Sequence, residues 1–451
     1  MRRILIAGGT VWEEAGPRRA DVLLDGGRVE AVGRLAGECG EVEAIDATGC
    51  HVLPGLIDVH VHVADRIGAH SLADDVPLVT RCSVSGGVTT VATFVTQRSD
   101  ESLGGGVTRM LDEVRRGAWS DVALHLTPTA WPWDLEDIER LVASGCRTFK
   151  LYTTYRPAGL FTDWERLETA MRALSRFGVR LFLHCEDDGV LGAVDTTCVD
   201  LTEPFSHSVL RPEQAEVAAI RRVVDLAERT GCAVHVVHVS TAEGVEAVAA
   251  ARSRAPVTCE TAPHYLLLDE ERLRGATGHR WMCTPPLRAE ATRARLEALV
   301  VGGAVDLLAT DHCPFLTGDK DSRRGGDIRL IPGGLPGVGA LLPLAFEILV
   351  RHGKRTLASI VHMLSANPAR VLGIYPRKGT LAPGSDGDVV VLDVEGSERT
   401  LRSTYSTCHD PWSDRTTTLG IRAAIVGGNV TVVDGDLAPG ATPVGRPLVR
   451  L

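Results

Sequence analysis

The chain has 451 residues, of which 44% are hydrophobic and 24% are charged, so it can bury a barrel-sized core with a smaller domain beside it. Its net charge of −10 and the absence of a basic tract argue against nucleic acid as a partner. No segment approaches about 18 uninterrupted apolar residues, so no membrane span is predicted.

The cysteines bear on the compartment. There are eleven, an odd number, and no Cys-x-x-Cys pair occurs. Several lie inside apolar, strand-like runs, namely Cys82, Cys146, Cys232 and Cys259. Reduced thiols in the core are typical of a cytosolic protein, and the N-terminal apolar run is too short for a signal peptide. We therefore predict a cytoplasmic location.

The two ends of the chain are both rich in short strands. The first 53 residues are expected to hold strands at Ile4–Ala7, Asp21–Leu24 and Val29–Val32. The sequence Asp25-Gly26-Gly27 predicts a hairpin turn between the last two of them. The final stretch is expected to hold strands at Asp388–Asp393, Arg422–Val426 and Val430–Val433. Because the first stretch is too short to hold its own core, we expect residues 1–53 and 378–451 to form one composite β-sandwich domain.

Between these ends, strand-like apolar runs alternate with amphipathic helical stretches. In Glu213–Arg229, for example, apolar residues recur at three- and four-residue steps. The strand-like runs are Val88–Phe94, Val122–Thr127, Thr148–Tyr152, Val179–His184, Ala233–His238, Val257–Glu260 and Ala304–Thr310. With the run that ends at His62 they make about eight βα units, the number a (β/α)8 barrel needs. We therefore predict an α/β fold with a TIM-type barrel over residues 54–377.

The first strand of this barrel ends in His60-Val61-His62. Because residues i and i+2 of a strand point to the same face, two imidazoles would lie side by side at the strand's carboxyl end, where such barrels hold their active sites. Taken alone, the pair could equally be two hydrogen-bonded polar side chains. Other predicted strand ends supply matching groups, however: Lys150, His184, His238 and Asp311. Histidine nitrogen and carboxylate oxygen suit Zn²⁺ and similar divalent ions.

Lys150 is the unusual member of this set, since an ammonium group repels a cation. A salt bridge with nearby acids would explain it as a structural residue. Reaction with CO₂ would instead give a carbamate, whose two oxygens can bridge two metal ions. Beside four histidines and Asp311, we favour the carbamate.

Longer motifs accompany these residues. They are Ser71-Leu72-Ala73-Asp74-Asp75, Gly86-Gly87-Val88-Thr89-Thr90, Glu260-Thr261-Ala262-Pro263-His264-Tyr265-Leu266, Cys283-Thr284-Pro285-Pro286-Leu287-Arg288, Thr310-Asp311-His312-Cys313-Pro314-Phe315 and Asn367-Pro368-Ala369-Arg370. Together they resemble the amidohydrolase superfamily, in its cyclic-amide branch, and are most similar to dihydropyrimidinase and D-hydantoinase. The resemblance covers essentially the whole chain. It implies hydrolytic opening of a cyclic amide or imide of the dihydropyrimidine or hydantoin type.

The resemblance also implies a binuclear metal centre. His60, His62, Lys150 and Asp311 would hold one ion, and Lys150, His184 and His238 the other. The expected cofactors are two divalent ions, with zinc the expected metal, and a CO₂-derived carbamate on Lys150. A water bridging the two ions would become hydroxide because two cations lower its pKa. Asp311 would take its proton and return it to the leaving nitrogen.

Three further residues are expected to contact the substrate. Tyr155, five residues past Lys150 as in hydantoinases, would donate to the developing oxyanion, although a packed or surface tyrosine is the alternative. Thr284 and Gly333 stand where the family contacts the substrate amide, partly through main-chain groups. Thr284 replaces the usual Ser and Gly333 a common Asn, so these contacts are less secure. The resemblance further implies a small-molecule substrate as partner and a homo-oligomer, expected to be a tetramer.

Three alternatives stay open. Allantoinase is close, although the motif at Asp311 is the hydantoinase-like version. Dihydroorotase is favoured by His184-Cys185-Glu186-Asp187 and opposed by Ala64, which stands where that enzyme has a carboxylate-binding arginine. A non-catalytic dihydropyrimidinase-related scaffold would have lost metal ligands, and all six are present here. The remaining histidines near these motifs are interpreted as structural: His51, His235, His264 and His312, with His235 facing away from the site on an alternating strand.

Overall fold

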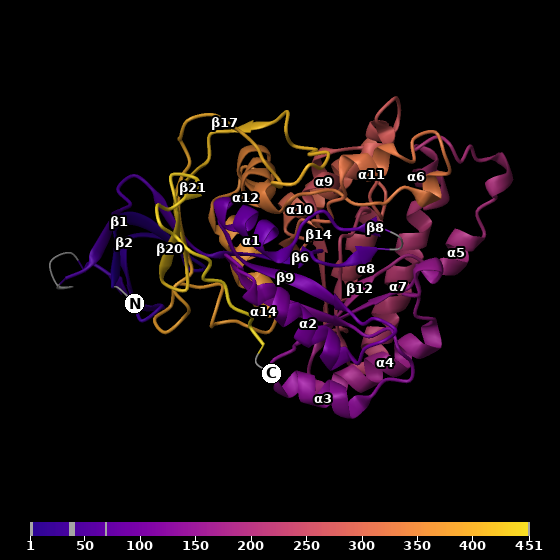
Figure 1. The fold of residues 1–451 in the computed structure, drawn as a ribbon, viewed down its shortest axis with the longest axis horizontal. Helices are drawn as coiled ribbons and strands as arrows, with labels where there is room; N and C mark the ends of the chain where they lie inside the picture. The colour runs from indigo at the N-terminus through magenta and orange to yellow at the C-terminus, as the bar shows by residue number, and fades with distance from the viewer. Residues whose placement is uncertain (1–2, 36–40, 68–69, 450–451) are drawn as a thin grey trace.

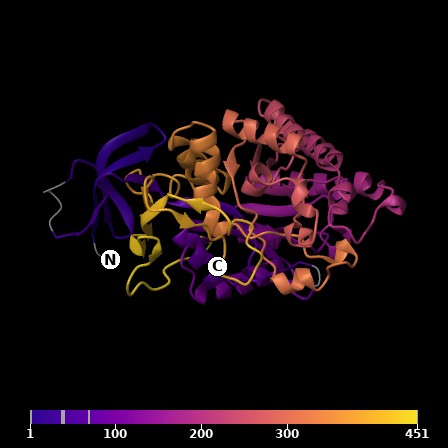
Figure 2. The same cartoon turned by 90° about the horizontal axis from the view of Figure 1, so that it is seen from above.

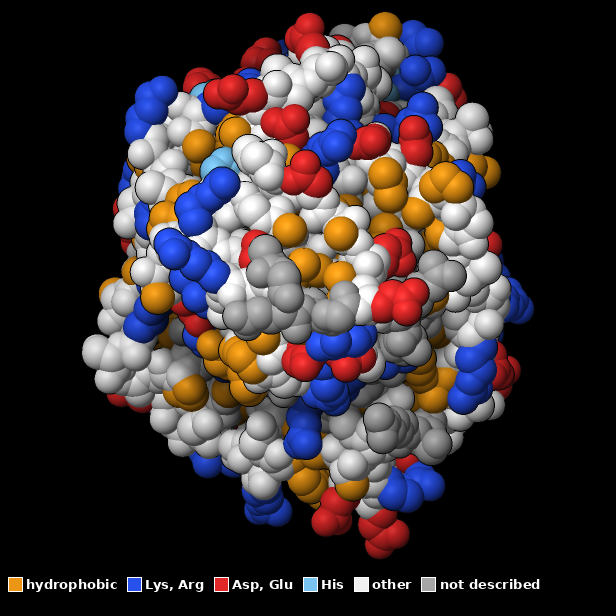
Figure 3. Space-filling model, turned by 90° about the vertical axis from the view of Figure 1, so that its left-hand side faces the viewer, with side chains coloured by type: hydrophobic (Ala, Val, Ile, Leu, Met, Phe, Trp, Pro, Cys, Tyr) orange, Lys and Arg blue, Asp and Glu red, His pale blue; other side chains and the backbone are white. Residues whose placement is uncertain are grey.

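The computed structural model describes residues 3–35, 41–67 and 70–449. Figure 1 shows a barrel of alternating strands and helices, with a smaller sheet beside it that contains both the first (indigo) and last (yellow) parts of the chain. On the surface at the small-sheet end, acidic and basic side chains are interspersed (Figure 3). Within the described part of the chain, no helix is both long and apolar enough to cross a membrane.

Eight parallel strands form the barrel, each paired with its neighbour in chain order. They are β6 (Leu56–Val61), β9 (Val88–Thr96), β10 (Asp121–Thr127), β11 (Thr148–Tyr152), β12 (Arg180–His184), β13 (Ala233–Val236), β14 (Val257–Thr261) and β15 (Leu307–Leu308). The backbone closes the ring, because the His62 N–H donates to the His312 carbonyl at 2.8 Å. The predicted (β/α)8 architecture is therefore confirmed.

Helices connect these strands and cover the outside of the barrel, as the two ribbon views show (Figures 1 and 2). The longer ones are α1 (Val76–Ser85), α2 (Leu103–Arg115), α3 (Leu135–Ala143), α4 (Trp164–Phe177), α7 (Glu213–Thr230), α8 (Ala242–Ala251) and α10 (Glu290–Gly302). The short ones are α5 (Asp188–Gly192), α6 (Ser206–Leu210), α9 (Pro263–Leu267), α11 (Thr317–Asp321), α12 (Leu341–Ala345), α13 (Ala358–Val361) and α14 (Asn367–Val371). The apolar positions that predicted α7 are the buried ones, including Val217, Ile220 and Val224. Gly231, with a φ of 68°, ends this helix in a left-handed conformation that glycine adopts at little cost.

Two barrel strands are shorter than predicted. The predicted strand Ala304–Thr310 is reduced to β15 (Leu307–Leu308). Beyond it, the Thr310 N–H and hydroxyl donate to Asp58 at 3.1 and 2.5 Å. The predicted strand ending at His238 stops at Val236, and His238 itself has a φ of 38°.

The two chain ends form one nine-stranded sheet. Its strands are β1 (Ile4–Glu13), β2 (Gly16–Asp25), β3 (Arg28–Gly33), β4 (Glu43–Asp46), β5 (His51–Pro54), β16 (Val389–Asp393), β19 (Gly420–Val426), β20 (Asn429–Val433) and β21 (Asp436–Leu437). Antiparallel pairing of β5 with β16 joins the N-terminal strands to the C-terminal ones. Buried side chains from both ends, such as Ile6, Val22 and Val391, share one core. The exact boundaries at 53/54 and 377/378 stay predictions.

Three short features complete the fold. Gly26 and Gly27, with φ of 56° and 82°, form the predicted two-residue turn between β2 and β3. Two small ribbons lie outside the main sheets: β7 (Arg66–Ile67) with β8 (His70–Ser71), and β17 (Arg399–Thr400) with β18 (Thr416–Thr417). The cysteines in the described part of the chain are free thiols, and most of them are buried. Cys39 lies outside the described residues.

Candidate active site

The six predicted metal ligands come together at the carboxyl ends of the barrel strands. On one side, Nε2 of His60 lies 3.2 Å from Oδ1 of Asp311, and Nε2 of His62 lies 3.4 Å from the same oxygen. One ligand atom from each of these three residues lies within 4.8 Å of the others, which is close enough for a single cation to bind all three. On the other side, Nδ1 of His184 lies 2.9 Å from Nε2 of His238. The ring centroids of His60 and His238 are 5.2 Å apart, so the two groups adjoin.

Lys150 lies on β11, with its Nζ 5.3 Å from the centroid of the Phe94 ring and 5.0 Å from that of Tyr152. Its side chain is buried, and the structure gives Nζ no hydrogen-bond partner among the described residues. Burial lowers the pKa of Lys150 to about 8. Nε2 of His60 is likewise buried without a hydrogen bond. Buried polar atoms are rarely left in this state, so the donor set fits divalent ions and a modified lysine.

Glu260, at the end of the seventh barrel strand β14, orients His60. Its carboxylate accepts a short hydrogen bond from Nδ1 of His60 and a second one, at 3.0 Å, from Nε2 of His235. Because a carboxylate only accepts, Nδ1 of His60 carries the proton and Nε2 presents its lone pair to the site. Burial raises the pKa of Glu260, but His60 and His235 more than offset this and hold it well below its usual range. Glu260 was not predicted, although it ends the one late strand that had no assigned ligand.

The position of His235 differs from the prediction. It pairs in register with Phe182 on β12, two residues before His184, and its ring lies 4.7 Å from that of Phe182. It therefore lies inside the barrel beneath the site, where the alternation argument had turned it away. The argument failed because β13 ends at Val236 and the backbone turns before His238. Its structural interpretation is kept, since it supports Glu260.

The other histidines interpreted as structural also lie outside the ligand set. Nε2 of His312 is 2.9 Å from Asp74, and its Nδ1 accepts from the backbone N–H of Gly337 at 3.0 Å. Nδ1 of His51 accepts from the indole of Trp12 in the small sheet. His264 is buried and its Nε2 has no hydrogen-bond partner among the described residues.

Several site residues hold unusual backbone conformations. Asp311, His238 and Tyr155 have φ values of 49°, 38° and 71°, and Ala64, close after His62, has 52°. Non-glycine residues in this left-handed region are strained, and such strain gathers at functional sites. These side chains are thus set by turns beyond the strand ends rather than by the strands alone.

A cavity of about 130 Å³ opens over the ligands. The predicted substrate-contacting residues Tyr155, Thr284 and Gly333 all line it. The Tyr155 ring lies 4.9 Å from that of His184, and burial raises the pKa of Tyr155 well above its usual range, so its hydroxyl is a donor at neutral pH. A Cβ added at Gly333 would lie 3.0 Å from Oγ1 of Thr284. Thr284 and Gly333 thus lie side by side in the cavity wall, and nothing in the structure explains the absence of the Asn expected at position 333.

Comparisons with known proteins agree with this geometry. A model of the amidohydrolase family matches residues 51–431. D-phenylhydantoinase of Escherichia coli (strain SE11) is 35% identical over 413 residues, covering 88% of this chain and 87% of the relative. Among solved structures, dihydropyrimidinase from Brevibacillus agri NCHU1002 has a TM-score of 0.92 at 29% identity, covering 99% of this chain and 98% of that one. D-hydantoinase from Bacillus sp. AR9 has a TM-score of 0.90 at 31% identity, covering 98% of both chains.

Proposed function

The chain belongs to the amidohydrolase family, and we propose that it opens the ring of a cyclic amide or imide of the dihydropyrimidine or hydantoin type by hydrolysis. The observation that carries the proposal is the convergence of four histidines and Asp311 around a buried lysine without a hydrogen-bond partner. The names of the relatives, D-phenylhydantoinase and dihydropyrimidinase, support the same class of substrate.

We assign two divalent ions to this site, with zinc the expected metal. His60, His62 and Asp311 would hold one ion, His184 and His238 the other, and Lys150, as a carbamate formed with CO₂, would bridge them. When bound, the ions would lower the pKa of a water between them and so supply a nucleophile at neutral pH.

The chain's own residues would then move protons and stabilise charge. Burial raises the pKa of Asp311, but His60 and His62 more than offset this and keep it below its usual value, so Asp311 is a carboxylate at neutral pH. It would accept the proton of the attacking water and return it to the leaving nitrogen. Tyr155 would donate its hydroxyl to the oxyanion that forms on the attacked carbonyl. Thr284 and Gly333 line the cavity where the substrate amide would lie.

The preference of the site for neutral or charged substrate rings is expected to depend on the residues that follow the first barrel strand. Ala64 offers no group to a ring carboxylate, whereas dihydroorotate would bring one into the site. Arg66, two residues further along, lines the same cavity but would have to turn in to pair with that carboxylate. A charge left without a fixed partner in such a place costs several kcal/mol, in the range of about 2–5. Neutral rings such as dihydrouracil or a 5-substituted hydantoin should therefore be opened much faster than dihydroorotate.

The test compares kcat/KM for dihydrouracil, a 5-substituted hydantoin, allantoin and dihydroorotate at one pH and one metal loading, with metal analysis of the same sample. Fastest turnover of dihydroorotate or allantoin would assign the chain to those activities instead. Absence of turnover with every ring, at full metal content, would favour the non-catalytic scaffold. The homotetramer and the cytoplasmic location stay predictions, and light scattering of the purified protein tests the first.

A further inference from the structure

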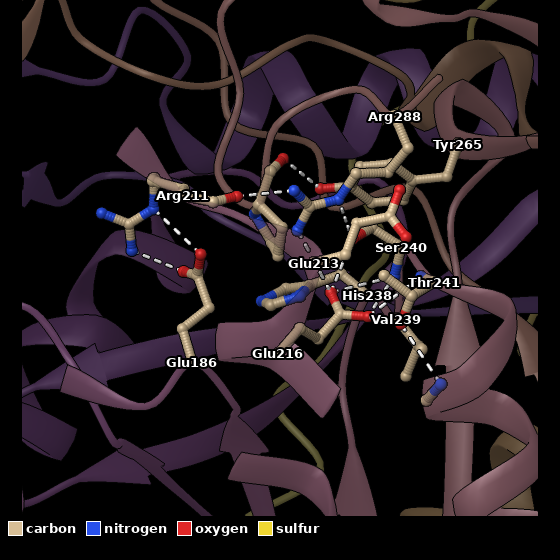
Figure 4. A network of polar contacts seen from close by, with 12 residues as sticks. Glu186, Arg211, Glu213, Glu216, His238, Val239, Ser240, Thr241, Tyr265 and Arg288 are labelled. Carbon is tan, nitrogen blue, oxygen red and sulfur yellow. Dashed lines mark hydrogen bonds and ion pairs between the residues drawn. The ribbon is translucent and has the colours of Figure 1, made fainter. Parts of the chain in front are cut away.

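A buried polar network lies beside His238, around the start of α7 (Figure 4), and one of its members, Glu186, contacts His184. We propose that this network positions these two histidines, so that the second ion site is built, and can be lost, separately from the first. Its members are Glu186, Arg211, Glu216, Ser240, Thr241 and Arg288. The inference rests on the binuclear centre of the proposed function and adds to it the positioning residues of one half.

The first part of the network fixes His184. Nε2 of His184 lies 2.7 Å from Glu186, whose carboxylate receives two hydrogen bonds from Arg211, at 3.0 Å from Nε and 2.5 Å from Nη2. Since the carboxylate only accepts, Nε2 of His184 carries the proton and Nδ1 keeps its lone pair, aimed at His238. The guanidinium carbon of Arg211 also lies 5.3 Å from the centroid of the Tyr155 ring. Arg211 thus holds a ligand through Glu186 and packs against the predicted oxyanion donor.

The second part fixes the turn that carries His238. The Glu216 carboxylate is buried and accepts from the backbone N–H groups of both Ser240 and Thr241, at distances from 2.9 to 3.1 Å. It also accepts from their hydroxyls, at 2.6 and 2.5 Å. These bonds pin the backbone directly after His238, whose φ of 38° is a strained conformation for a residue with a side chain. By fixing the backbone at Ser240 and Thr241, Glu216 keeps the turn in the conformation that directs the His238 ring toward His184.

Arg288 joins the two parts. Its side chain is buried, and it donates from Nε to the Ser240 hydroxyl at 2.9 Å and from Nη1 to the Arg211 carbonyl at 2.6 Å. Its remaining nitrogen lies 3.9 Å from Glu216. The network thus collects residues from five separate segments of the chain behind one pair of ligands.

The other half of the centre has different support. His60 is held by Glu260, and the turn before Asp311 is held by Asp58 through Thr310. The two halves do meet at one point, because Glu260 also accepts from the backbone N–H of His238 at 3.3 Å. Glu260 is therefore unsuitable for a test that must separate the halves, whereas Arg211 and Glu216 are suitable.

The experiment measures how tightly each ion binds. Metal-free protein with bicarbonate present is titrated with Zn²⁺ in a calorimeter, and bound zinc is counted after gel filtration. The variants are Arg211→Gln, which removes the guanidinium fork, and Glu216→Gln, which cannot accept all four hydrogen bonds. Each should bind one zinc ion as the unchanged protein does and the other about 10–100-fold more weakly, the usual cost of losing a group that orients a ligand. Arg211→Lys, which keeps the charge without the fork, should fall between.

Two controls separate positioning from general damage. Arg415 forms a more exposed pair with Glu347 at 2.8 Å, away from the ligands, so Arg415→Gln should bind both ions normally. The double variant Glu186→Gln/Arg211→Gln removes both charges together and leaves no buried unpaired charge. It therefore tests whether the Glu186 carboxylate is needed to keep the proton on Nε2 of His184. Circular dichroism checks that this variant is folded.

The outcomes are distinct. Unchanged affinity for both ions in folded Arg211→Gln, Glu216→Gln and the double variant overturns the inference, and so does an equal loss at both sites. If the unchanged protein binds two ions but hydrolyses no cyclic amide, the proposed substrate class fails. The zinc titrations of the variants then still decide this inference. If the unchanged protein binds fewer than two ions, the binuclear centre fails and this inference fails with it.

Discussion

At the carboxyl end of the barrel, Lys150 lies beside Asp311 and the four histidines; at the amino end, Lys378 lies among Asp121, Asp386 and Asp388. Both places hold three potential ligand atoms within 4.8 Å of one another. At the amino end, Nζ of Lys378 is 2.8 Å from Asp121 and 3.5 Å from Asp386, and it donates a short hydrogen bond to Asp388. Lys150 has no such partner within the described part of the chain.

The difference lies in what satisfies the buried charge. At Lys378 the protein's own ammonium fills the space between the carboxylates, and despite burial the carboxylates raise the pKa of Lys378 above its usual value. At Lys150 burial dominates and lowers the pKa to about 8. Proximity of ligand atoms therefore does not by itself mark a metal site, and the proposed site differs in holding a buried lysine without an acceptor among the described residues. Lys378 joins the barrel to the small sheet, whereas we assign Lys150 to the chemistry.

Replacing each lysine by methionine tests this contrast with matched variants, and the larger effect is expected at Lys150. Lys150→Met should lose most bound metal and nearly all turnover, because no other group at this position can bridge the two ions. Its stability in metal-free form should change little, since Nζ has no hydrogen bond to lose. Metal analysis, kinetics and urea unfolding of the metal-free proteins measure these three quantities. Full metal content in this variant would contradict the carbamate.

Lys378→Met should show the reverse pattern. Among the described residues it leaves buried Asp388 without an ion-pair partner, and it leaves Asp121 and Asp386 with only Arg446 and Arg377 beside them. Breaking such a buried cluster lowers the free energy of unfolding by about 3–5 kcal/mol. Metal content and kcat of the folded protein should stay near those of the unchanged protein. Urea unfolding beside zinc analysis checks both. A variant that kept its stability but lost metal would show that the two ends had been assigned the wrong way round.

Tyr155→Phe distinguishes two roles at the carboxyl end of the barrel. One is binding of the ions, and the other is stabilisation of the negative charge that forms on the substrate. The ring stays beside His184, so both ions should remain bound. Loss of the hydroxyl removes one oxyanion donor, which should lower kcat by about 10²–10³, or about 2.7–4 kcal/mol. Steady-state kinetics at full metal content measure this. An unchanged kcat would make Tyr155 a packing residue.

The sequence was sufficient for the barrel, and it pointed to the six predicted ligands because each of them lies in or shortly after an apolar strand. His60 and His62 are recognisable by their spacing of two residues. His184 is the last residue of β12 as predicted, whereas Lys150 lies in the middle of β11. The strand alternation failed at His235, where β13 ends early and the chain turns. No local sequence pattern predicts this turn, because Glu216, the residue that we propose to hold it, is distant in sequence.

The supporting groups were harder to find for the same reason. Glu260 acts on His60 across 200 positions of the chain, and Arg211 reaches His184 only through Glu186. A carboxylate two residues after a predicted ligand, as Glu186 is, was the one local signal available. The proximity of Thr284 and Gly333 is visible only as a distance between two loops.

The smallest expected effect is a pH dependence at the amino end, and its sign follows from the direction of the shift. Because the pKa of Lys378 is raised in the folded protein, the folded state keeps its proton at pH values where the unfolded chain, with an ordinary lysine pKa near 10.5, releases it. The contribution of Lys378 to stability is therefore complete below pH 10.5 and declines above it, by up to about 1.4 kcal/mol per pH unit. The measurement is the difference in free energy of unfolding between the unchanged protein and Lys378→Met, taken by urea unfolding at several pH values from neutral to strongly alkaline. Other alkaline titrations occur in both proteins and cancel in this difference, so it should stay constant at neutral and mildly alkaline pH and then shrink. A difference that grew with pH would mean that the pKa of Lys378 is lowered in the folded protein, as that of Lys150 is, and the contrast between the two ends would be lost.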